Sequence, residues 1–309
     1  MMRKFIALLF LGFFAICASA QDWPEQLNIT YVKAPFNIQN MVMKNQKLLE
    51  KEFEKEKIEI HWIPIKAGIN QVRGIAAGEI DMVGAMNTST LLIANASGNS
   101  IVMVDGVAHP DDTFAIMAKA DVKTIADLKG KQVVGPKGTV LHHLLVAALE
   151  NEGMQIGDVQ WVSMNLPASL TTLLSGRADA ALLAAGGILK AKQAGFHDVV
   201  RAKGLVETNL VLAARSDFAK RYPEVVRRVA KVNRQALQWA QNHPQEAIAL
   251  GAKEHQISLQ DAEQLFNWSR FYSDLTEDDI RALEKNQAFL LQQKMMTRPV
   301  DVRSLLFQK

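Results

Sequence analysis

Apolar and polar residues alternate in short stretches near the start of the chain, and stretches with helical spacing separate them. Leu27, Ile29 and Tyr31 alternate with polar neighbours, which predicts a β-strand. Further strands are predicted over 58–62 and 80–85, and helices over 38–53, 69–77 and 88–96. This alternation favours an α/β fold with a layered, mostly parallel sheet.

The same order of elements returns in the next part of the chain. Strands are predicted over 131–134, 159–162 and 178–183, with helices over 139–152 and 167–174. Both parts share a local pattern, Gly78-Glu79-Ile80-Asp81 and Gly176-Arg177-Ala178-Asp179, in which a glycine suits the end of a helix. The pattern predicts two similar α/β lobes, with coincidence between two ordinary turns as the alternative. Asp81 and Asp179 begin strands, opposite the strand ends where ligands bind, so we predict structural roles for them.

The last third of the chain has a different texture. A strand is predicted over 210–214, followed by helices over 223–241, 245–253, 259–268 and 277–294. Ser258 with Asp261, and Thr276 with Asp279, resemble capping boxes in which Asp replaces the usual Glu. We expect this helical tail to pack back on the first lobe.

The first twenty residues have the pattern of a secretory signal peptide. Arg3 and Lys4 precede an uncharged apolar run over 5–17, and Ala18-Ser19-Ala20 offers small residues at a cleavage site. The run is shorter than the roughly 20 residues of a membrane-spanning helix, although an uncleaved anchor is the alternative. The sequence therefore predicts a periplasmic protein cleaved after Ala20.

Cleavage would change the composition in two ways. It would remove Cys17, the only cysteine, so no disulfide and no cysteine metal ligand is expected. It would also remove Arg3 and Lys4 from the 35 basic residues, which leaves the bases close to balance with the 32 acidic ones. A balanced charge gives no support for nucleic-acid binding. We expect a soluble protein with no cofactor and no metal.

Three stretches, in this order behind the signal peptide, carry a family resemblance. The first runs from Trp62-Ile63-Pro64 to Gly78-Glu79-Ile80-Asp81-Met82-Val83-Gly84. The second is Asp127-Leu128-Lys129-Gly130-Lys131, followed by Lys137-Gly138-Thr139 and His142, and the third runs from Leu166-Pro167-Ala168 to Gly176-Arg177-Ala178-Asp179-Ala180. Together they resemble the periplasmic sulfonate-, nitrate- and taurine-binding proteins, the SsuA/THI5-like (NMT1/THI5-like) family.

The resemblance implies an α/β, two-lobed type II periplasmic binding protein fold with a hinge and an interlobe ligand cleft. Lobe 1 would comprise residues 21–112 and 211–309, and lobe 2 residues 113–210. Such a protein would be a monomer that captures a small anionic molecule, sulfonate- or taurine-like, for an ABC permease in the inner membrane.

The strongest candidates for ligand contact are Gly138, Thr139 and Val140, where a strand turns into a helix. The first N–H groups of a helix lack partners and bind anions. Thr139 would add a hydroxyl donor or act as an ordinary N-cap. Met86, Asn87 and Thr88 form the matching turn in lobe 1, with simple capping as the alternative.

Other candidates follow the first two strands and the helix starts of lobe 2. Lys33 would balance an anion's charge or remain solvated, Phe36 would form an apolar wall, and Gly68, beside Lys66 and Ala67, ends the second strand's loop. His142 is expected in the cleft and His143 on the surface. Adjacent histidines face different sides of a helix, which argues against a metal pair. Ala184, Ala185 and Gly186 stand where aliphatic-sulfonate members of the family carry a W-D-P-type segment, so an aromatic residue and a carboxylate are missing, and this departure would leave room for a larger or different ligand.

Two other functions compete with import. A subunit that presents its ligand to a membrane sensor would have the same sequence features. A periplasmic enzyme on the same fold would need a catalytic pair in the cleft, yet the sequence has neither H-E-x-x-H nor G-x-S-x-G. We therefore predict a binding protein and no enzymatic activity.

Overall fold

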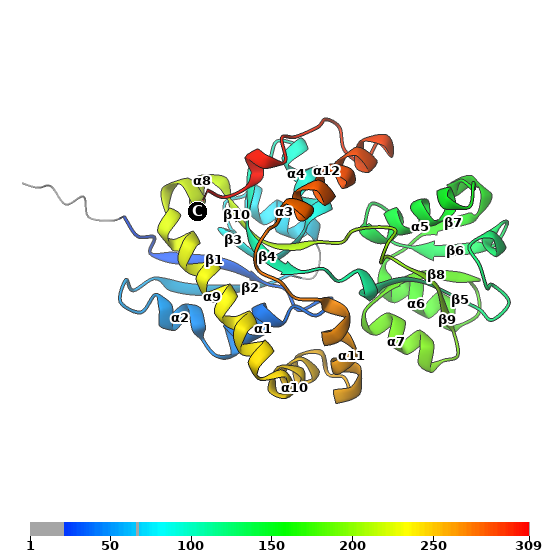
Figure 1. Ribbon diagram of the computed structural model, residues 1–309, viewed down its shortest axis with the longest axis horizontal. Coiled ribbons are helices and arrows are strands. Elements are labelled where there is room, and N and C mark those ends of the chain that lie inside the picture. The colour runs from blue at the N-terminus through cyan, green and yellow to red at the C-terminus, as the bar shows by residue number, and fades with distance from the viewer. Residues whose placement is uncertain (1–21, 66–67, 309) are drawn as a thin grey trace, which may run out of the picture.

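A computed structural model describes residues 22–65 and 68–308, so the predicted signal peptide, Lys66 and Ala67 lie outside the described residues. The chain forms two lobes, each built on a five-stranded sheet with helices on its faces (Figure 1). The sheet of lobe 1 has the strand order β2 (Glu59–Pro64), β1 (Gln26–Tyr31), β3 (Met82–Asn87), β10 (Leu210–Arg215), β4 (Ile101–Ala108). The sheet of lobe 2 has the order β7 (Gln160–Ser163), β6 (Gln132–Gly135), β8 (Ala180–Ala184), β5 (Phe114–Ala118), β9 (His197–Arg201).

The two sheets follow one plan. In each, three strands are parallel, and the next strand, β10 in lobe 1 and β5 in lobe 2, runs antiparallel to both of its neighbours. The prediction of two similar lobes is confirmed by this shared order. The sheets are more mixed than the predicted mostly parallel arrangement, because β10 and β5 run antiparallel to their neighbours. The strands β4, β5 and β9 were not recognised from the sequence.

Asp81 and Asp179 occupy equivalent places in the two lobes. Each carboxylate accepts a backbone hydrogen bond at the start of a neighbouring strand, from Asn28 N (2.9 Å) and from Gln132 N (3.0 Å). Each also pairs with a cation of the antiparallel strand or its end, Asp81 with Arg215 (3.3 Å) and Asp179 with Lys119 (3.1 Å). In both lobes, the aspartate of the Gly-x-x-Asp pattern thus links the start of its own strand to a neighbouring strand. This agrees with the structural roles predicted for Asp81 and Asp179.

The helices of the lobes alternate with their strands. In lobe 1 they are α1 (Ile38–Asn45), α2 (Leu48–Glu52), α3 (Gly68–Ala76) and α4 (Thr88–Ala96); in lobe 2 they are α5 (Val140–Asn151), α6 (Leu166–Leu174) and α7 (Gly186–Gln193). Short 3₁₀ turns are η1 (Asp111–Thr113), η2 (Ala126–Leu128), η3 (Ile156–Asp158) and η4 (Arg303–Leu305). The predicted single helix over 38–53 is wrong: the chain breaks between α1 and α2, where Lys47 adopts a left-handed conformation (φ 52°).

The C-terminal helices surround lobe 1 and reach the junction between the lobes (Figure 1). They are α8 (Ser216–Arg221), α9 (Pro223–Asn242), α10 (Pro244–His255), α11 (Leu259–Ser269) and α12 (Glu277–Gln292). Thr276 and Asp279 form the predicted capping box, and Ser258 accepts the N–H of Asp261. Buried residues of α9 and α10 share one hydrophobic core with β1 and α1, as expected for a tail that packs on lobe 1. Within the described ranges, no helix combines the length and apolar character needed to cross a membrane.

Candidate functional site

A cavity of about 670 Å³ lies between the lobes, at the carboxyl ends of β3 and β6. Lobe 1 contributes residues of α3, α4 and the loop after β1, and lobe 2 contributes Phe114 and the turn from Lys137 to Val140. This position agrees with the rule that ligands of open α/β sheets bind beyond the carboxyl ends of the strands. We call it the front cavity.

The N-terminus of α5 faces this cavity without a side-chain cap. Thr139 is the N-cap residue with extended backbone (φ −123°, ψ 172°), but its hydroxyl donates to the carbonyl oxygen of Pro136 (3.0 Å) and caps no helical N–H. Gly138 has φ +73°, a left-handed conformation that glycine adopts readily. The first-turn N–H groups therefore remain available at the positive end of the helix dipole.

The N-terminus of α4, across the cavity, differs in this respect. The side chain of Asn87 accepts the N–H of Ser89 (2.9 Å), and Thr88 N donates to the carbonyl oxygen of Asn209 (3.0 Å). Asn87 thus acts as a conventional N-cap. Of the two helix starts, that of α5 is the better prepared to receive an anion.

The remaining wall is mainly apolar. Apolar side chains from both lobes line it, namely Val32, Ala34, Pro35, Ile69, Val72, Ala85, Ile93, Ala94, Phe114, Val140 and Leu210. Lys137 is the single charged residue among the described residues that line the cavity, and no carboxylate is among them. The arrangement suits a small anion that has an apolar body.

A comparison with protein families adds to this geometry. Residues 52–247, more than half of the chain, match the model of the family described as NMT1/THI5 like. The chain belongs to the NMT1/THI5-like family.

Two relatives from Escherichia coli are named as binding proteins. A protein of Escherichia coli (strain K12) named for binding aliphatic sulfonates is 30% identical over 185 residues, which span 58% of this chain and 56% of that relative. The taurine-binding periplasmic protein of the same organism is 26% identical over 249 residues, or 78% of this chain and 73% of the relative. The crystal structure of the periplasmic aliphatic sulphonate binding protein SsuA from Escherichia coli superposes with a TM-score of 0.83 at 22% identity, covering 93% of this chain and 98% of SsuA. The two-lobed periplasmic binding protein fold expected from the sequence is confirmed.

In this NMT1/THI5-like chain, five of the predicted ligand residues line the front cavity: Gly68, Asn87, Gly138, Thr139 and Val140. Four others of lobe 1 do not line it. Phe36 and Met86 are fully buried in the core, and Thr88 is 2% exposed. The Nζ atom of Lys33 donates to the carbonyl oxygen of Glu254 (2.9 Å) and lies 3.6 Å from its carboxylate, so this cation already has a partner.

The predicted residues of lobe 2 have mixed outcomes. His142 does not line the cavity; its ring stacks on Trp161 with centroids 5.6 Å apart, and its Nδ1 atom accepts a hydrogen bond from Gly138 N (3.4 Å). Ala185 and Gly186 form the start of α7, where Ala185 N donates to the carbonyl oxygen of Thr113 (2.8 Å), and neither lines the cavity. His143 is 8% exposed and stacks on Phe289 of α12, so the prediction of a surface position is wrong.

Some of the cavity residues that sequence reasoning missed lie on single faces of two helices. Ile69 and Val72 on α3, and Ser89 and Ile93 on α4 with Ser97 at its C-cap, follow helical spacing. The spacing of small and polar residues on α4 was a usable signal, because that face is less apolar than a core-facing helix requires.

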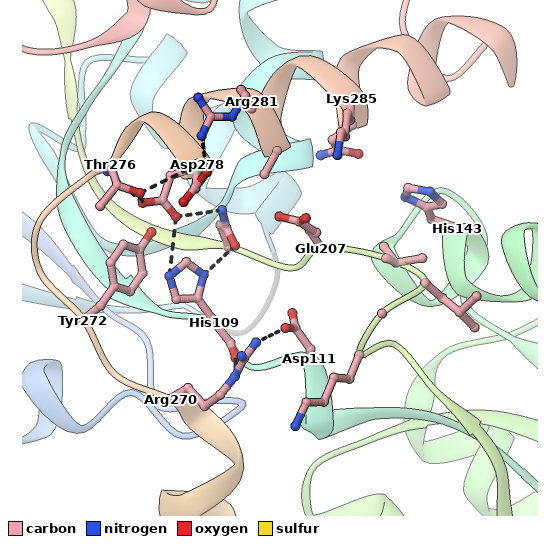
Figure 2. A pocket seen from close by; sticks show the side chains of 18 of the residues that line it. His109, Asp111, His143, Glu207, Arg270, Tyr272, Thr276, Asp278, Arg281 and Lys285 are labelled. Carbon is pink, nitrogen blue, oxygen red and sulfur yellow. Dashed lines mark hydrogen bonds and ion pairs between the residues drawn. The ribbon is translucent and has the colours of Figure 1, made fainter.

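A second cavity of about 860 Å³ is lined by residues of the two segments that connect the lobes, among them His109, Asp111 and Glu207, and by residues of α12 (Figure 2). A polar network holds these segments to the C-terminal region. His109 contacts Asn209 (Nδ1 to Oδ1, 2.8 Å) and Asp279 (Nε2 to Oδ1, 3.4 Å), and its ring stacks on Tyr272. Asp111 accepts hydrogen bonds from Thr208 N and Oγ1 and pairs with Arg270. His109 and Asp111 thus hold the connecting segments to the C-terminal region. The described residues hold no grouping of three His, Cys, Asp or Glu side chains suited to a metal.

His143 gives the protein a predictable pH dependence. Burial, followed by the neighbouring His142, lowers the pKa of His143 to about 4. Its pKa is about 6.5 in an unfolded chain, so the unfolded state binds more protons between these two values. The free energy of unfolding is therefore expected to fall by about 1–3 kcal/mol as the pH is lowered from 7 to 4.5. Urea denaturation across this range measures the loss.

The variant His143→Phe keeps an aromatic ring against Phe289 but cannot titrate. It should lose less stability than the natural protein over the same range. Equal losses in the two proteins would show that His143 is not the group responsible.

Proposed function

We propose that this chain is the periplasmic solute-binding component of an ABC importer, and that it captures an organosulfonate with an apolar body. The observation that carries the proposal is the uncapped N-terminus of α5 in a mainly apolar cavity shared by both lobes. The sulfonate oxygens would accept hydrogen bonds from the first N–H groups of α5. Lys137, which also lines the cavity, would add positive charge. The names of the two E. coli relatives support this class of ligand.

The cavity favours a sulfonate without an amino group. Taurine carries an ammonium group, and a buried ammonium group needs a carboxylate partner to offset the loss of water. The described lining residues offer no carboxylate, and the side-chain amide oxygens among them, those of Asn37, Gln71, Asn87 and Asn99, are neutral acceptors. The chain would therefore prefer an alkyl or aryl sulfonate to taurine.

The proposal includes the route and the partners of the protein. The signal peptide would direct export and be removed after Ala20, and the loaded monomer would deliver its ligand to a permease of the inner membrane. The protein would bind its ligand without chemical change, because no nucleophile–base pair faces the front cavity among the described lining residues.

Calorimetric titration with matched ligands tests this function. Propane-1-sulfonate and taurine have the same shape and differ in a methyl group against an ammonium group, while butanoate replaces the sulfonate by a carboxylate. We expect propane-1-sulfonate, or a longer alkanesulfonate, to bind at least about tenfold more tightly than taurine, since desolvating an unpaired ammonium group costs several kcal/mol. Tighter binding of taurine would contradict the proposed ligand class, and no binding by any sulfonate would contradict the function.

A further inference from the structure

Helix α12 is a fixed part of lobe 1. Ile280, Leu283 and Leu290 are almost fully buried and share a hydrophobic core with residues of α4 and β3. Gln287 adds two hydrogen bonds to the backbone of Val300, one to its N–H (2.8 Å) and one to its carbonyl oxygen (3.1 Å). When the lobes move relative to each other, α12 must therefore move with lobe 1.

The same helix contacts the lobe 1 side of the front cavity. Asn286, which is 6% exposed, donates from Nδ2 to the hydroxyl oxygen of Ser89 (2.8 Å). Ser89 lies in the first turn of α4 and lines the cavity. Asn286 thus fixes the side chain at one helix start of the proposed ligand site.

One turn further along, α12 contacts lobe 2. The ring of Phe289 stacks on that of His143, with centroids 3.4 Å apart and planes 11° from parallel. Gln293, just after α12, donates to the carboxylate of Glu150 near the end of α5 (3.3 Å). Figure 2 shows His143 extending from lobe 2 toward α12. His143 is three residues from Val140, so the contact lies one turn from the uncapped start of α5.

Asn286 and Phe289 are three residues apart and therefore neighbours on the surface of α12. We infer that α12 is an interlobe clasp, in which Asn286 and Phe289 act as positioning residues for the two helix starts that face each other across the front cavity. The clasp sets the distance between the start of α4 and the start of α5, so that both helix starts line the front cavity. On the opposite flank of the crossing segments, Trp268 of α11 lies 4.2 Å from the guanidinium group of Arg201 in lobe 2, so the lobes are held on two sides.

The position of the lobes can be measured without a ligand. In residues 21–309, which contain no cysteine, spin labels at Lys51→Cys on α2 and Lys190→Cys on α7 report the distance between exposed sites of the two lobes. Phe289→Ala should broaden this distance distribution relative to the natural sequence, and Phe289→Tyr, which keeps the ring, should restore it. Gln287→Ala is the matched control, because it removes contacts of α12 within lobe 1 and none to lobe 2.

Affinity gives a second readout, which rests on the proposed function. Loss of one aromatic stack should raise the Kd for propane-1-sulfonate about three- to tenfold, through faster dissociation. If Phe289→Ala unfolds the protein, His143→Ala is used instead, because it removes the same ring contact from the lobe 2 side. His143→Ala must then broaden the distance distribution between the spin labels. Distances and Kd equal to those of Gln287→Ala would overturn the clasp. Absence of sulfonate binding in the natural protein would instead refute the proposed function, and the distances alone would then decide on the clasp.

Discussion

Replacing Val140 by proline is expected to weaken sulfonate binding about ten- to a hundredfold while the protein remains folded. Val140 is the first residue of α5, where the N–H has no partner within the helix and proline is well tolerated. The preceding Thr139 has extended backbone, as a residue before proline requires. The substitution thus removes one N–H from the proposed anion site, and a hydrogen bond to a charged group contributes about 1.5–3 kcal/mol.

Val140→Ala is the matched control, since it shortens the same side chain and keeps the N–H. Titration of both variants with propane-1-sulfonate isolates the contribution of the N–H, and thermal denaturation checks that both remain folded. Equal affinities of the two variants would show that the anion does not bind at the start of α5. A large loss in both would assign the effect to the apolar side chain.

The start of α5 was predictable from sequence because local features define it. A strand, a glycine and a helix in this order place unpartnered N–H groups at the carboxyl edge of a sheet, wherever the rest of the chain folds. The paired patterns at Gly78 and Gly176 were predictable for the same reason, because a left-handed glycine ends a helix and an aspartate begins the following strand. In the structure each aspartate also accepts a hydrogen bond from a backbone N–H of a neighbouring strand that lies earlier in the chain. Both signals depend on a few consecutive residues.

The errors concern side chains whose surroundings come from distant segments. His143 was predicted at the surface, yet Phe289, 146 positions later, covers its ring. Lys33 was predicted to pair with an anionic ligand, yet its amino group contacts the carboxylate and the carbonyl oxygen of Glu254 in α10. The spacing of residues within a helix or a loop does not tell which later helix packs against it. The strands β4, β5 and β9 were missed for a related reason: nothing in the local spacing shows that they complete sheets begun elsewhere.

Phe36 is an instructive case, because a place in the cavity wall and a place in the core predict opposite results for the same substitution. As a cavity wall, it would affect affinity. In the structure it is fully buried, its ring stacks on His255 of α10 (5.2 Å between centroids) and meets Phe266 of α11 edge-on (6.5 Å). It therefore fastens two C-terminal helices to the loop after β1.

Phe36→Ala is accordingly expected to lower the free energy of unfolding by about 3–5 kcal/mol, the usual cost of removing a buried aromatic ring. The affinity of the folded protein for propane-1-sulfonate should change less than about threefold, the effect of roughly 0.6 kcal/mol. Ile69→Ala should show the opposite profile, because Ile69 lines the front cavity and its side chain is 58% exposed. Guanidinium denaturation and calorimetric titration of both variants separate the two roles. If Phe36→Ala instead had normal stability and a weakened affinity, Phe36 would be part of the ligand site, and the cavity wall would extend toward α10.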